Sequence, residues 1–445
     1  MLKTNSVFFF DSTEFESIIQ HYLDVGRQSL AEKAIKLGLE QHPTSVNLKL
    51  LKAESLIYAD KLDEADKLLA ELHALEPCNE EVYIQKANIF SKKNEHQQAI
   101  DTLKIALAYT KNDADVLAMI GMEYLYLDNF DDARLNFAKC LNVDFEDYSS
   151  LYNVIYCFDM QNQHKEAIEY LDDFIDKDPY SEVAWHQLGR QHFILEQYEE
   201  ALRAFDYAVV IDEHFVGAHL EKAKTLEQLK KYNEAIENYL ITIELDDPTA
   251  FAFYRIGKCY EKIEDFDLAV QYFKKTVKED PLLDKGWLAL TNRYMEAKNH
   301  QKALYFINKA ITIDESNSLY WRRYAEINLK LNHFEEVISA FYKCLDFNDT
   351  ALDIYVGLAD VLNFIGEFKE ASKVLIKARR SYPDHAELDY RLGCIYFILG
   401  EAEKSNKYLS KALSADFDYH AIFKEIYPTV FEDETVLTLI AKYQH

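Results

Sequence analysis

A small residue recurs every 34 residues along almost the whole of this chain. Valine and serine fill the two places, 337 and 405, where the recurring alanine is missing. The alanines are Ala31, Ala65, Ala99, Ala133, Ala167, Ala201, Ala235, Ala269, Ala303 and Ala371. A strict period of this length predicts a solenoid, because one unit cannot bury its own apolar face and must stack on its neighbours.

The register divides the chain into twelve repeats without insertion or deletion, if Ser12 is position 1. The repeats begin at 12, 46, 80, 114, 148, 182, 216, 250, 284, 318, 352 and 386. We expect an N-terminal arm or cap over residues 1–11, the twelve repeats over 12–419 and capping helices over 420–445. No linker or low-complexity tract suggests a further division.

The composition favours helices with short turns, since 49% of the residues are hydrophobic and only 11 are glycine and 7 proline. The few helix breakers follow the register. Proline recurs at position 32, and glycine at positions 8 and 15. Within residues 182–215, apolar residues recur at helical spacing twice, on either side of a short turn. Each repeat is therefore predicted to be two antiparallel amphipathic helices, giving an all-α solenoid. Small residues at positions 8 and 20 should meet between the helices, with a large residue at position 24 filling the remaining space.

The pattern of an aromatic residue, leucine, a small residue and tyrosine, followed by alanine, phenylalanine, alanine and proline, resembles the tetratricopeptide repeat family. The best matches are Trp185, Leu188, Gly189, Ala201, Phe205 and Ala208, and Phe253, Ile256, Gly257, Tyr260, Ala269, Phe273 and Pro281. The resemblance implies a right-handed superhelix with first helices lining a concave groove and second helices outside. It also implies a non-enzymatic protein, which we expect to be of the bacterial type.

Both ends of the array carry apolar segments. Val436, Leu439, Ile440 and Tyr443 form a helical stripe after Pro428, which is typical of a capping helix or of a partner-binding helix. Residues 7–10 are apolar but too few for a signal peptide or a membrane span, so they either pack on the first repeat or form a mobile arm. With no such span elsewhere, we expect a cytoplasmic protein that does not insert into membranes.

The sequence carries no catalytic or metal-binding signature. Phosphate-binding, nucleophile-elbow and zinc-protease motifs are absent. The cysteines form no CxxC pair and occupy positions suited to small buried residues. His96, His164 and His300 replace aromatic residues at position 17. We therefore predict no catalytic residue, no metal and no cofactor.

The charge is strongly acidic, with 49 Lys and Arg against 77 Asp and Glu, a net charge of −28. Nucleic acid is a poor partner for such a chain. In the family, positions 2, 5, 6, 9, 12 and 13 of each first helix face the groove. Over repeats 6 to 10, nine Lys and Arg stand there against five Glu (Glu221, Glu227, Glu261, Glu296 and Glu326), reversing the sign of the chain.

These inward positions predict a peptide-binding groove for an extended acidic or carboxylate-terminated segment, with amide and aromatic side chains beside the cations. The groove residues are Tyr152, Asn153, Tyr156, Gln187, Arg190, Lys224, Phe251, Tyr254, Arg255, Lys258, Lys285, Asn292, Arg322 and Arg323, with Lys262 and Lys330 adding charge. The alternative is pairing inside the groove, of Arg323 with Glu326 and of Lys258 with Glu261.

Repeats 2 to 4 have a mostly apolar lining at the same positions, which suits an amphipathic helix, an unfolded client or the chain's own residues 8–10. Packing against the neighbouring first helix is the alternative. These residues are Leu50, Leu51, Ile57, Ile84, Met119, Met122, Leu125 and Tyr126. Some members of the family bind the carboxylate tails of chaperones with a set of Lys, Asn and Arg from three consecutive repeats. No three consecutive repeats here supply that set. Three hypotheses follow: a scaffold or adaptor that binds a protein partner, a holding chaperone, and an assembly factor. The sequence leaves the oligomeric state open.

Overall fold

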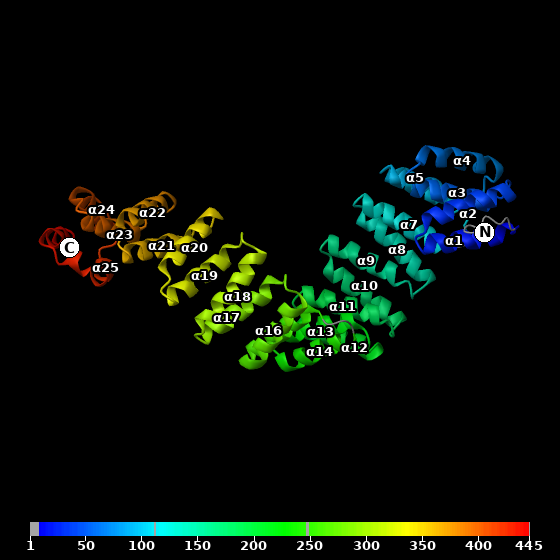
Figure 1. The fold of residues 1–445 in the computed structure, drawn as a ribbon. Coiled ribbons are helices and arrows are strands. Elements are labelled where there is room, and N and C mark those ends of the chain that lie inside the picture. The colour runs from blue at the N-terminus through cyan, green and yellow to red at the C-terminus, as the bar shows by residue number, and fades with distance from the viewer. Residues whose placement is uncertain (1–8, 111–112, 246–248, 445) are drawn as a thin grey trace. The chain divides into compact units, whose positions relative to one another are not determined.

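The computed structural model describes residues 9–110, 113–245 and 249–444. The described residues form helices and turns, with no strand among them, and consecutive helices pack in pairs. This confirms the expected all-α solenoid. The contacts divide the chain into two compact units, Met1–Lys230 and Lys231–His445, each of which is a run of helix pairs (Figure 1). The division falls within repeat 7, between its first and second helices.

The first unit contains seven first helices and six second helices. The first helices are α1 (Ser12–Asp24), α3 (Val46–Tyr58), α5 (Glu80–Lys92), α7 (Asp113–Tyr126), α9 (Tyr148–Met160), α11 (Glu182–Ile194) and α13 (Val216–Gln228). The second helices are α2 (Gln28–Gln41), α4 (Leu62–Leu75), α6 (His96–Ala106), α8 (Phe130–Val143), α10 (His164–Lys177) and α12 (Tyr198–Ile211).

The second unit begins with α14 (Tyr232–Leu245), the second helix of repeat 7. Its first helices are α15 (Ala250–Lys262), α17 (Asp284–Glu296), α19 (Ser318–Lys330), α21 (Leu352–Phe364) and α23 (Ala386–Ile398). Its second helices are α16 (Phe266–Glu279), α18 (His300–Ile313), α20 (Phe334–Asp346), α22 (Phe368–Ser381) and α24 (Ala402–Ala415). Three short helices follow, α25 (His420–Ile426), α26 (Pro428–Phe431) and α27 (Glu434–Ala441).

Each first helix begins at a repeat start, except α7, which begins one residue earlier. Several are capped by a polar residue at the end of the preceding repeat. Ser181 Oγ, for example, accepts a hydrogen bond from the backbone N–H of Ala184 at 3.2 Å. Side-chain acceptors of this kind satisfy a free N–H of the first turn. The indole N–H of Trp185 donates to the carbonyl of Pro179 at 3.0 Å, which ties position 4 of a repeat to position 32 of the one before.

The turn inside every repeat contains one residue in the left-handed region, always at position 15. Glycine occupies it in three repeats, Gly26, Gly366 and Gly400, with φ between 67° and 89°. In the other nine it is a residue with a side chain, and φ lies between 54° and 64°. These residues are Asp60, Asn94, Asp128, Asn162, Glu196, Lys230, Glu264, Lys298 and Asn332. The same turn geometry thus recurs with quite different side chains.

The recurring alanines are all fully buried, and Val337 is buried in the same way. Ser405 is also buried, and its hydroxyl donates to the carbonyl of Gly393 at 2.9 Å, so the polar group is satisfied. This contact joins positions 20 and 8, as expected. The glycines at position 8 also lie against the large residue at position 24. A Cβ on Gly257 would stand 2.5 Å from Phe273 Cε1, and one on Gly121 would stand 2.7 Å from Phe137 Cζ. These glycines therefore make room for the ring at position 24.

The two ends of the chain are closed by their own apolar residues. The carbonyl of Phe10 accepts from His42 Nε2 at 2.7 Å, and its ring packs edge-on against Phe15, so residue 10 rests on repeat 1. Residues 7 and 8 lie outside the described residues. At the other end, Val436 is buried and Leu439, Ile440 and Tyr443 pack against the same core cluster. The C-terminal stripe therefore covers the last repeat.

Candidate functional site: a basic hollow in the second unit

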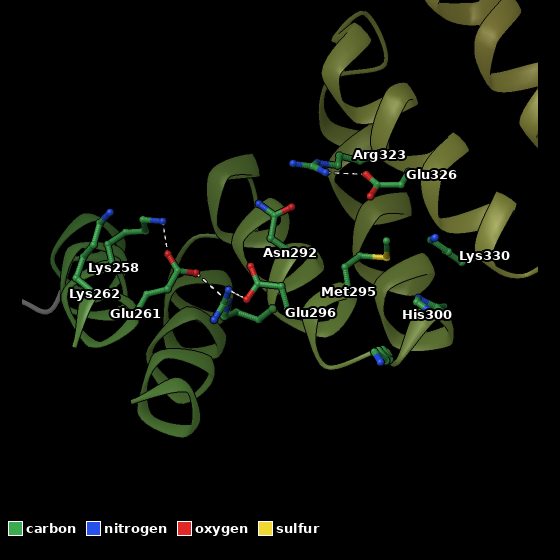
Figure 2. A pocket seen from close by; sticks show the side chains of 12 residues that line it. Lys258, Glu261, Lys262, Asn292, Met295, Glu296, His300, Arg323, Glu326 and Lys330 are labelled. Carbon is green, nitrogen blue, oxygen red and sulfur yellow. Dashed lines mark hydrogen bonds and ion pairs between the residues drawn. The ribbon is translucent and has the colours of Figure 1, made fainter. Parts of the chain in front are cut away.

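A hollow of about 770 Å³ lies along the first helices of repeats 8 to 10, within the second unit. Figure 2 shows its walls, formed by side chains of α15, α17 and α19. The lining residues are Lys258, Glu261, Lys262, Asn292, Arg293, Met295, Glu296, Lys298, His300, Arg323, Glu326 and Lys330. Most stand at positions 6, 9, 12 and 13, which are positions that the family resemblance places on the groove.

The lining is basic although the chain is acidic. Six Lys and Arg stand in it against three Glu, a net charge of +3 with His300 neutral, whereas the whole chain has a net charge of −28. Cations concentrated in a concave wall raise the local concentration of anions. The wall is therefore suited to a negatively charged ligand.

Part of this positive charge is neutralised inside the hollow. Lys258 pairs with Glu261, and Arg323 Nη1 lies 2.7 Å from Glu326 Oε2 (Figure 2). Both ion pairs that were expected as the alternative to ligand binding are thus formed. Each joins residues three apart on one helix. The Arg323 pair is largely exposed, and exposed pairs are worth only about 0–1 kcal/mol.

Arg293 connects the walls of the hollow and was missed by sequence reasoning. Its guanidinium lies 3.0 Å from Glu261 Oε1, pairs also with Glu296 and stands 4.6 Å from the centre of the Phe266 ring. It occupies position 10, which Cys157 and Cys259 fill in other repeats and which is a buried position. An arginine at a position that is buried in most other repeats was the available signal.

Three lysines of the hollow stand apart from these pairs. Lys262, Lys298 and Lys330 are exposed, and no ion pair or hydrogen bond of their side chains occurs within the described part of the chain. Lys262 and Lys330 share position 13 of their repeats, and Lys298 stands in the turn of the repeat between them. The hollow therefore carries uncompensated positive charge on α15, after α17 and on α19.

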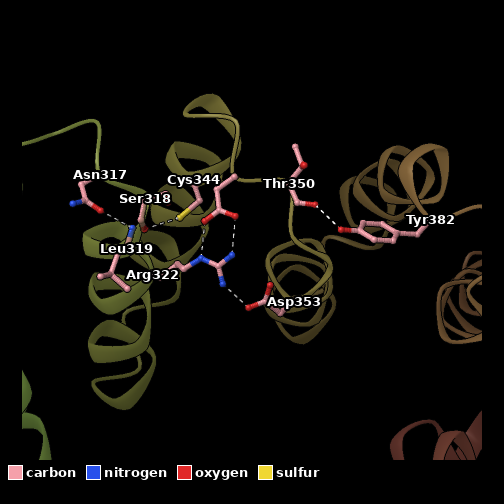
Figure 3. Close-up of polar contacts among 9 residues, drawn as sticks. Asn317, Ser318, Leu319, Arg322, Cys344, Thr350, Asp353 and Tyr382 are labelled. Atoms are coloured by element: carbon pink, nitrogen blue, oxygen red, sulfur yellow. Dashed lines mark hydrogen bonds and ion pairs between the residues drawn. The ribbon is translucent and has the colours of Figure 1, made fainter. Parts of the chain in front are cut away.

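Arg322 is held by one acid of its own repeat and one of the next repeat instead of facing a ligand. Its Nε and Nη2 each lie 2.7 Å from Asp349, and its Nη1 lies 2.6 Å from Asp353 at the start of α21 (Figure 3). Hydrogen bonds from Arg322 hold the pKa of Asp349 below its usual value. A forked arginine of this kind fixes geometry as well as charge. Arg322 thus joins repeats 10 and 11.

The other groove residues of the second unit are placed variously. Phe251 and Lys285 are exposed. The ring of Tyr254 packs against Phe273 with centres 6.0 Å apart, and Arg255 Nε donates to the Tyr239 hydroxyl at 3.4 Å. Asn292 is half-buried in the lining of the hollow. The structure therefore brings Lys258, Asn292 and Arg323 together in the hollow, but not Lys285 or Arg322.

The groove residues of the first unit form no comparable basic wall. Gln187 is fully buried and its carbonyl oxygen accepts from Arg190 Nη1 at 3.2 Å. Lys224 Nζ lies 2.8 Å from Glu221 Oε1. Tyr152 and Tyr156 are exposed on α9, with Asn153 half-buried between them. Here the inward face carries one charged residue, Asp159, on α9 and is largely self-paired beyond it.

The apolar lining expected in repeats 2 to 4 is mostly used for packing. Leu50 and Ile57 are buried, so neither offers a free surface. Leu51, Ile84, Met119 and Leu125 are half-buried against core clusters. Met122 and Tyr126, both on α7, remain exposed. Packing therefore accounts for the predicted residues of repeats 2 and 3, and of the eight only Met122 and Tyr126 in repeat 4 are exposed.

Comparison with known families agrees with the repeat geometry. Tetratricopeptide repeat models match residues 251–282 and 386–419, and both segments are helix pairs in the 34-residue register. The chain is a tetratricopeptide repeat protein. A model of the anaphase-promoting complex, cyclosome, subunit 3 matches residues 127–208. The bacterial-type character expected from the sequence stays a prediction.

This tetratricopeptide repeat protein also resembles a curated relative, anaphase-promoting complex subunit 3 of Schizosaccharomyces pombe. The two are 26% identical over 150 residues, which is 34% of this chain and 23% of the relative. The chain thus spans about a quarter of that protein's length.

Solved structures resemble this tetratricopeptide repeat protein at low identity. The APC/C hetero-tetramer Cut9-Hcn1 is 14% identical, with 86% of this chain and 90% of the other covered and a TM-score of 0.36. The C-terminal part of a repeat protein from Cytophaga hutchinsonii is 16% identical, with 54% and 99% covered and a TM-score of 0.43. YrrB, described as having an unusual peptide-binding site, is 15% identical, with 40% and 93% covered and a TM-score of 0.35.

The described residues were also considered as a membrane span and as a metal site, and they fit neither. None of their helices is long and apolar enough to cross a membrane. Nor do they bring three or more His, Cys, Asp or Glu side chains together as a metal site would require.

Proposed function

We propose that this protein is a non-catalytic scaffold that binds an acidic segment of a partner protein in the basic hollow of repeats 8 to 10. The observation that carries the proposal is the charge reversal: a lining of net charge +3, with three unpaired lysines, in a chain of net charge −28. Tetratricopeptide repeat proteins act in protein–protein interaction, and the hollow supplies a chemistry for one such contact.

The ligand's carboxylates would first meet Lys262, Lys298 and Lys330, which lack competing acids. The ion pairs of Lys258 and Arg323 are weak enough for a ligand carboxylate to replace the glutamate. Asn292 offers both a donor and an acceptor to an extended backbone in the same hollow. Because the contacts are exposed and electrostatic, affinity should fall steeply with added salt.

The likeness to anaphase-promoting complex subunit 3 supports a place in a multiprotein assembly. We propose that this chain is such a subunit or an assembly factor, with the basic hollow receiving a tail or loop of a neighbouring subunit. The expected cytoplasmic location belongs to the same proposal.

A fluorescent 15-residue peptide rich in glutamate tests the hollow directly by anisotropy. The variant Lys262→Glu/Lys298→Glu/Lys330→Glu should bind at least tenfold more weakly than the wild type. A matched control, Lys278→Glu/Lys309→Glu/Lys377→Glu, reverses three exposed lysines on second helices of the same unit. It makes the same change in net charge, so it reports long-range repulsion alone.

The proposal fails if both triple variants weaken binding equally, since only net charge would then matter. Comparing the peptide with a free C-terminus and with an amidated one separates two ligand types. A tenfold preference for the free terminus would assign the hollow to a C-terminal carboxylate, and equal affinity to an internal acidic segment.

The holding-chaperone function is less well supported. It relied on apolar side chains in repeats 2 to 4, and two of these, Leu50 and Ile57, are buried. Suppression of client aggregation at substoichiometric ratios would nevertheless favour it over a scaffold.

A further inference from the structure

The first unit presents exposed apolar side chains on the inward positions of two neighbouring repeats. Met122 and Tyr126 on α7, and Tyr152, Tyr156 and Met160 on α9, have between 38% and 58% of their surface exposed. We call these five residues the tyrosine–methionine face. Isolated exposed apolar residues are common, but five on one face mark an interaction surface.

The spacing of these residues gives the face a regular shape. Those on each helix are four residues apart, so they form a ridge along one side of that helix. The two helices belong to successive repeats, and Leu125 of α7 packs on the core cluster that contains Val154 of α9. Ridges of this kind match the way in which another helix packs.

The face is partly preorganised. The ring of Tyr126 stacks on His96, with ring centres 5.0 Å apart, and His96 Nδ1 lies 2.8 Å from Glu123 Oε2. Methionine adapts its shape to an apolar partner, and tyrosine offers a large apolar surface at low entropic cost. Asp159, next to Met160, accepts a hydrogen bond from Gln191 Nε2 at 2.9 Å, so this nearby carboxylate already has a partner.

The segment that carries the face is acidic. Residues 113–194 contain 17 Asp and Glu against 5 Lys and Arg, a net charge of −12, although several of these acids stand on the second helices α8 and α10. The field of so acidic a segment attracts a cationic partner and repels anionic lipid. We propose that the tyrosine–methionine face docks an amphipathic helix of a partner protein, with apolar side chains on the face and Lys or Arg along its edges. This surface is separate from the basic hollow and has the opposite charge preference.

An 18-residue model helix, with leucine on one face and lysine on the other and a fluorescent label, is a suitable probe for the full chain. A scrambled peptide of the same composition keeps the charge but loses the apolar face. We expect the amphipathic peptide to bind at least tenfold more tightly. Equal affinity for the two peptides would overturn the proposal, because charge alone would explain binding.

Variants locate the binding surface. Tyr152→Ser/Tyr156→Ser should weaken binding of the amphipathic peptide at least tenfold. The control Leu135→Ser/Val143→Ser removes equally exposed apolar residues from α8, a second helix of the same unit, and should change affinity less than twofold. If the tyrosine variant has a lower melting temperature than the control, Met160→Lys, which keeps both rings, replaces it and should weaken binding at least fivefold.

Unchanged binding by the tyrosine or methionine variant, or equal loss in the control, would contradict the assignment. The triple lysine variant of the basic hollow should bind the amphipathic peptide as the wild type does. Failure of this proposal therefore leaves the proposed function of the hollow untouched, and the reverse also holds.

Discussion

The ring of Phe205 lies directly over the Cα of Gly189, so that a Cβ on Gly189 would stand 2.6 Å from Phe205 Cε1. The pair joins position 8 of a first helix to position 24 of its second helix. Repeats 2 and 3 have alanine and leucine at the same positions, as Ala53 with Leu69 and Ala87 with Leu103. In these three repeats the smaller residue on the first helix goes with the larger one on the second.

Gly189→Ala should lower the free energy of unfolding by about 1–3 kcal/mol, because the new methyl group overpacks a buried contact. Chemical denaturation of the wild type and the variant measures the difference. The loss should exceed any gain that alanine brings as a better helix former.

Adding Phe205→Leu to Gly189→Ala recreates the pair found in repeats 2 and 3, and it should recover part of the loss. Phe205→Leu alone leaves a cavity and should be destabilising. A double-mutant cycle in which the two losses simply add would show that the residues do not share this space.

Arg322→Ala should destabilise the protein by about 2 kcal/mol while leaving affinity for an acidic peptide within twofold. The charged hydrogen bonds to Asp349 and Asp353 are lost, and Asp349 remains without its main partner. Neighbouring Arg323→Ala is the control, since its exposed pair with Glu326 contributes little to stability. The reverse pattern, with peptide affinity falling on loss of Arg322, would return this residue to the binding groove.

The first unit should lose stability on mild acidification because of His186. Burial lowers the pKa of His186 to about 4, with Arg190 and Lys224 acting in the same direction and Glu221 opposing them. His186 takes up a proton near pH 6.5 in the unfolded chain but only near pH 4 in the folded chain. Stability from this group is therefore complete above pH 6.5 and declines by roughly 3 kcal/mol toward pH 4.

Denaturation at several pH values, comparing wild type with His186→Gln, isolates this contribution. The difference between the two curves should shrink as the pH falls from 6.5 to 4. His214→Gln, which alters an exposed histidine, should run parallel to the wild type. A difference that does not vary with pH would rule out a buried neutral His186.

A thiol reagent should modify one cysteine of the native protein quickly. Cys78 is exposed, whereas the other five cysteines are buried. Burial raises the pKa of Cys157 and of Cys344 to about 11, which keeps them as unreactive thiols. Cys78→Ser should remove the fast phase, and urea should release the remaining five. Two or more fast thiols in the native state would contradict the burial of the other five cysteines.

The repeat pattern predicts the helices well because period, caps and breakers all act locally. Trp185, Pro179 and Ser181 lie within seven residues of one another, and their bonds follow from that closeness. Which glycine meets which ring was harder to predict, since Gly189 and Phe205 meet through the tilt of two helices. The sequence pattern named Ala201 as the neighbour of Gly189 but did not name the ring of Phe205.

The candidate site could be predicted only as a region. Register places Lys258, Asn292 and Arg323 on one wall, but it does not say where long side chains end. Arg322 and Arg323 are adjacent in the sequence, yet Arg322 turns to Asp349 at the end of its own repeat and to Asp353 of the next, while Arg323 stays in the hollow. Arg293 was missed because a rule that assigns positions 2, 5, 6, 9, 12 and 13 to the groove leaves position 10 out.

The left-handed residue at position 15 of each repeat marks a turn whose strain depends on the residue placed there. An ordinary L-residue held there carries roughly 1 kcal/mol of strain that glycine would not, although glycine gives some of this back in the unfolded chain. Glu196 and Glu264 are therefore places where glycine relaxes a turn without touching the packed core or either wall. Lys298 is different, because the strained turn is also what holds its charge at the hollow. In that turn glycine would relieve the backbone strain, whereas ligand binding requires the lysine.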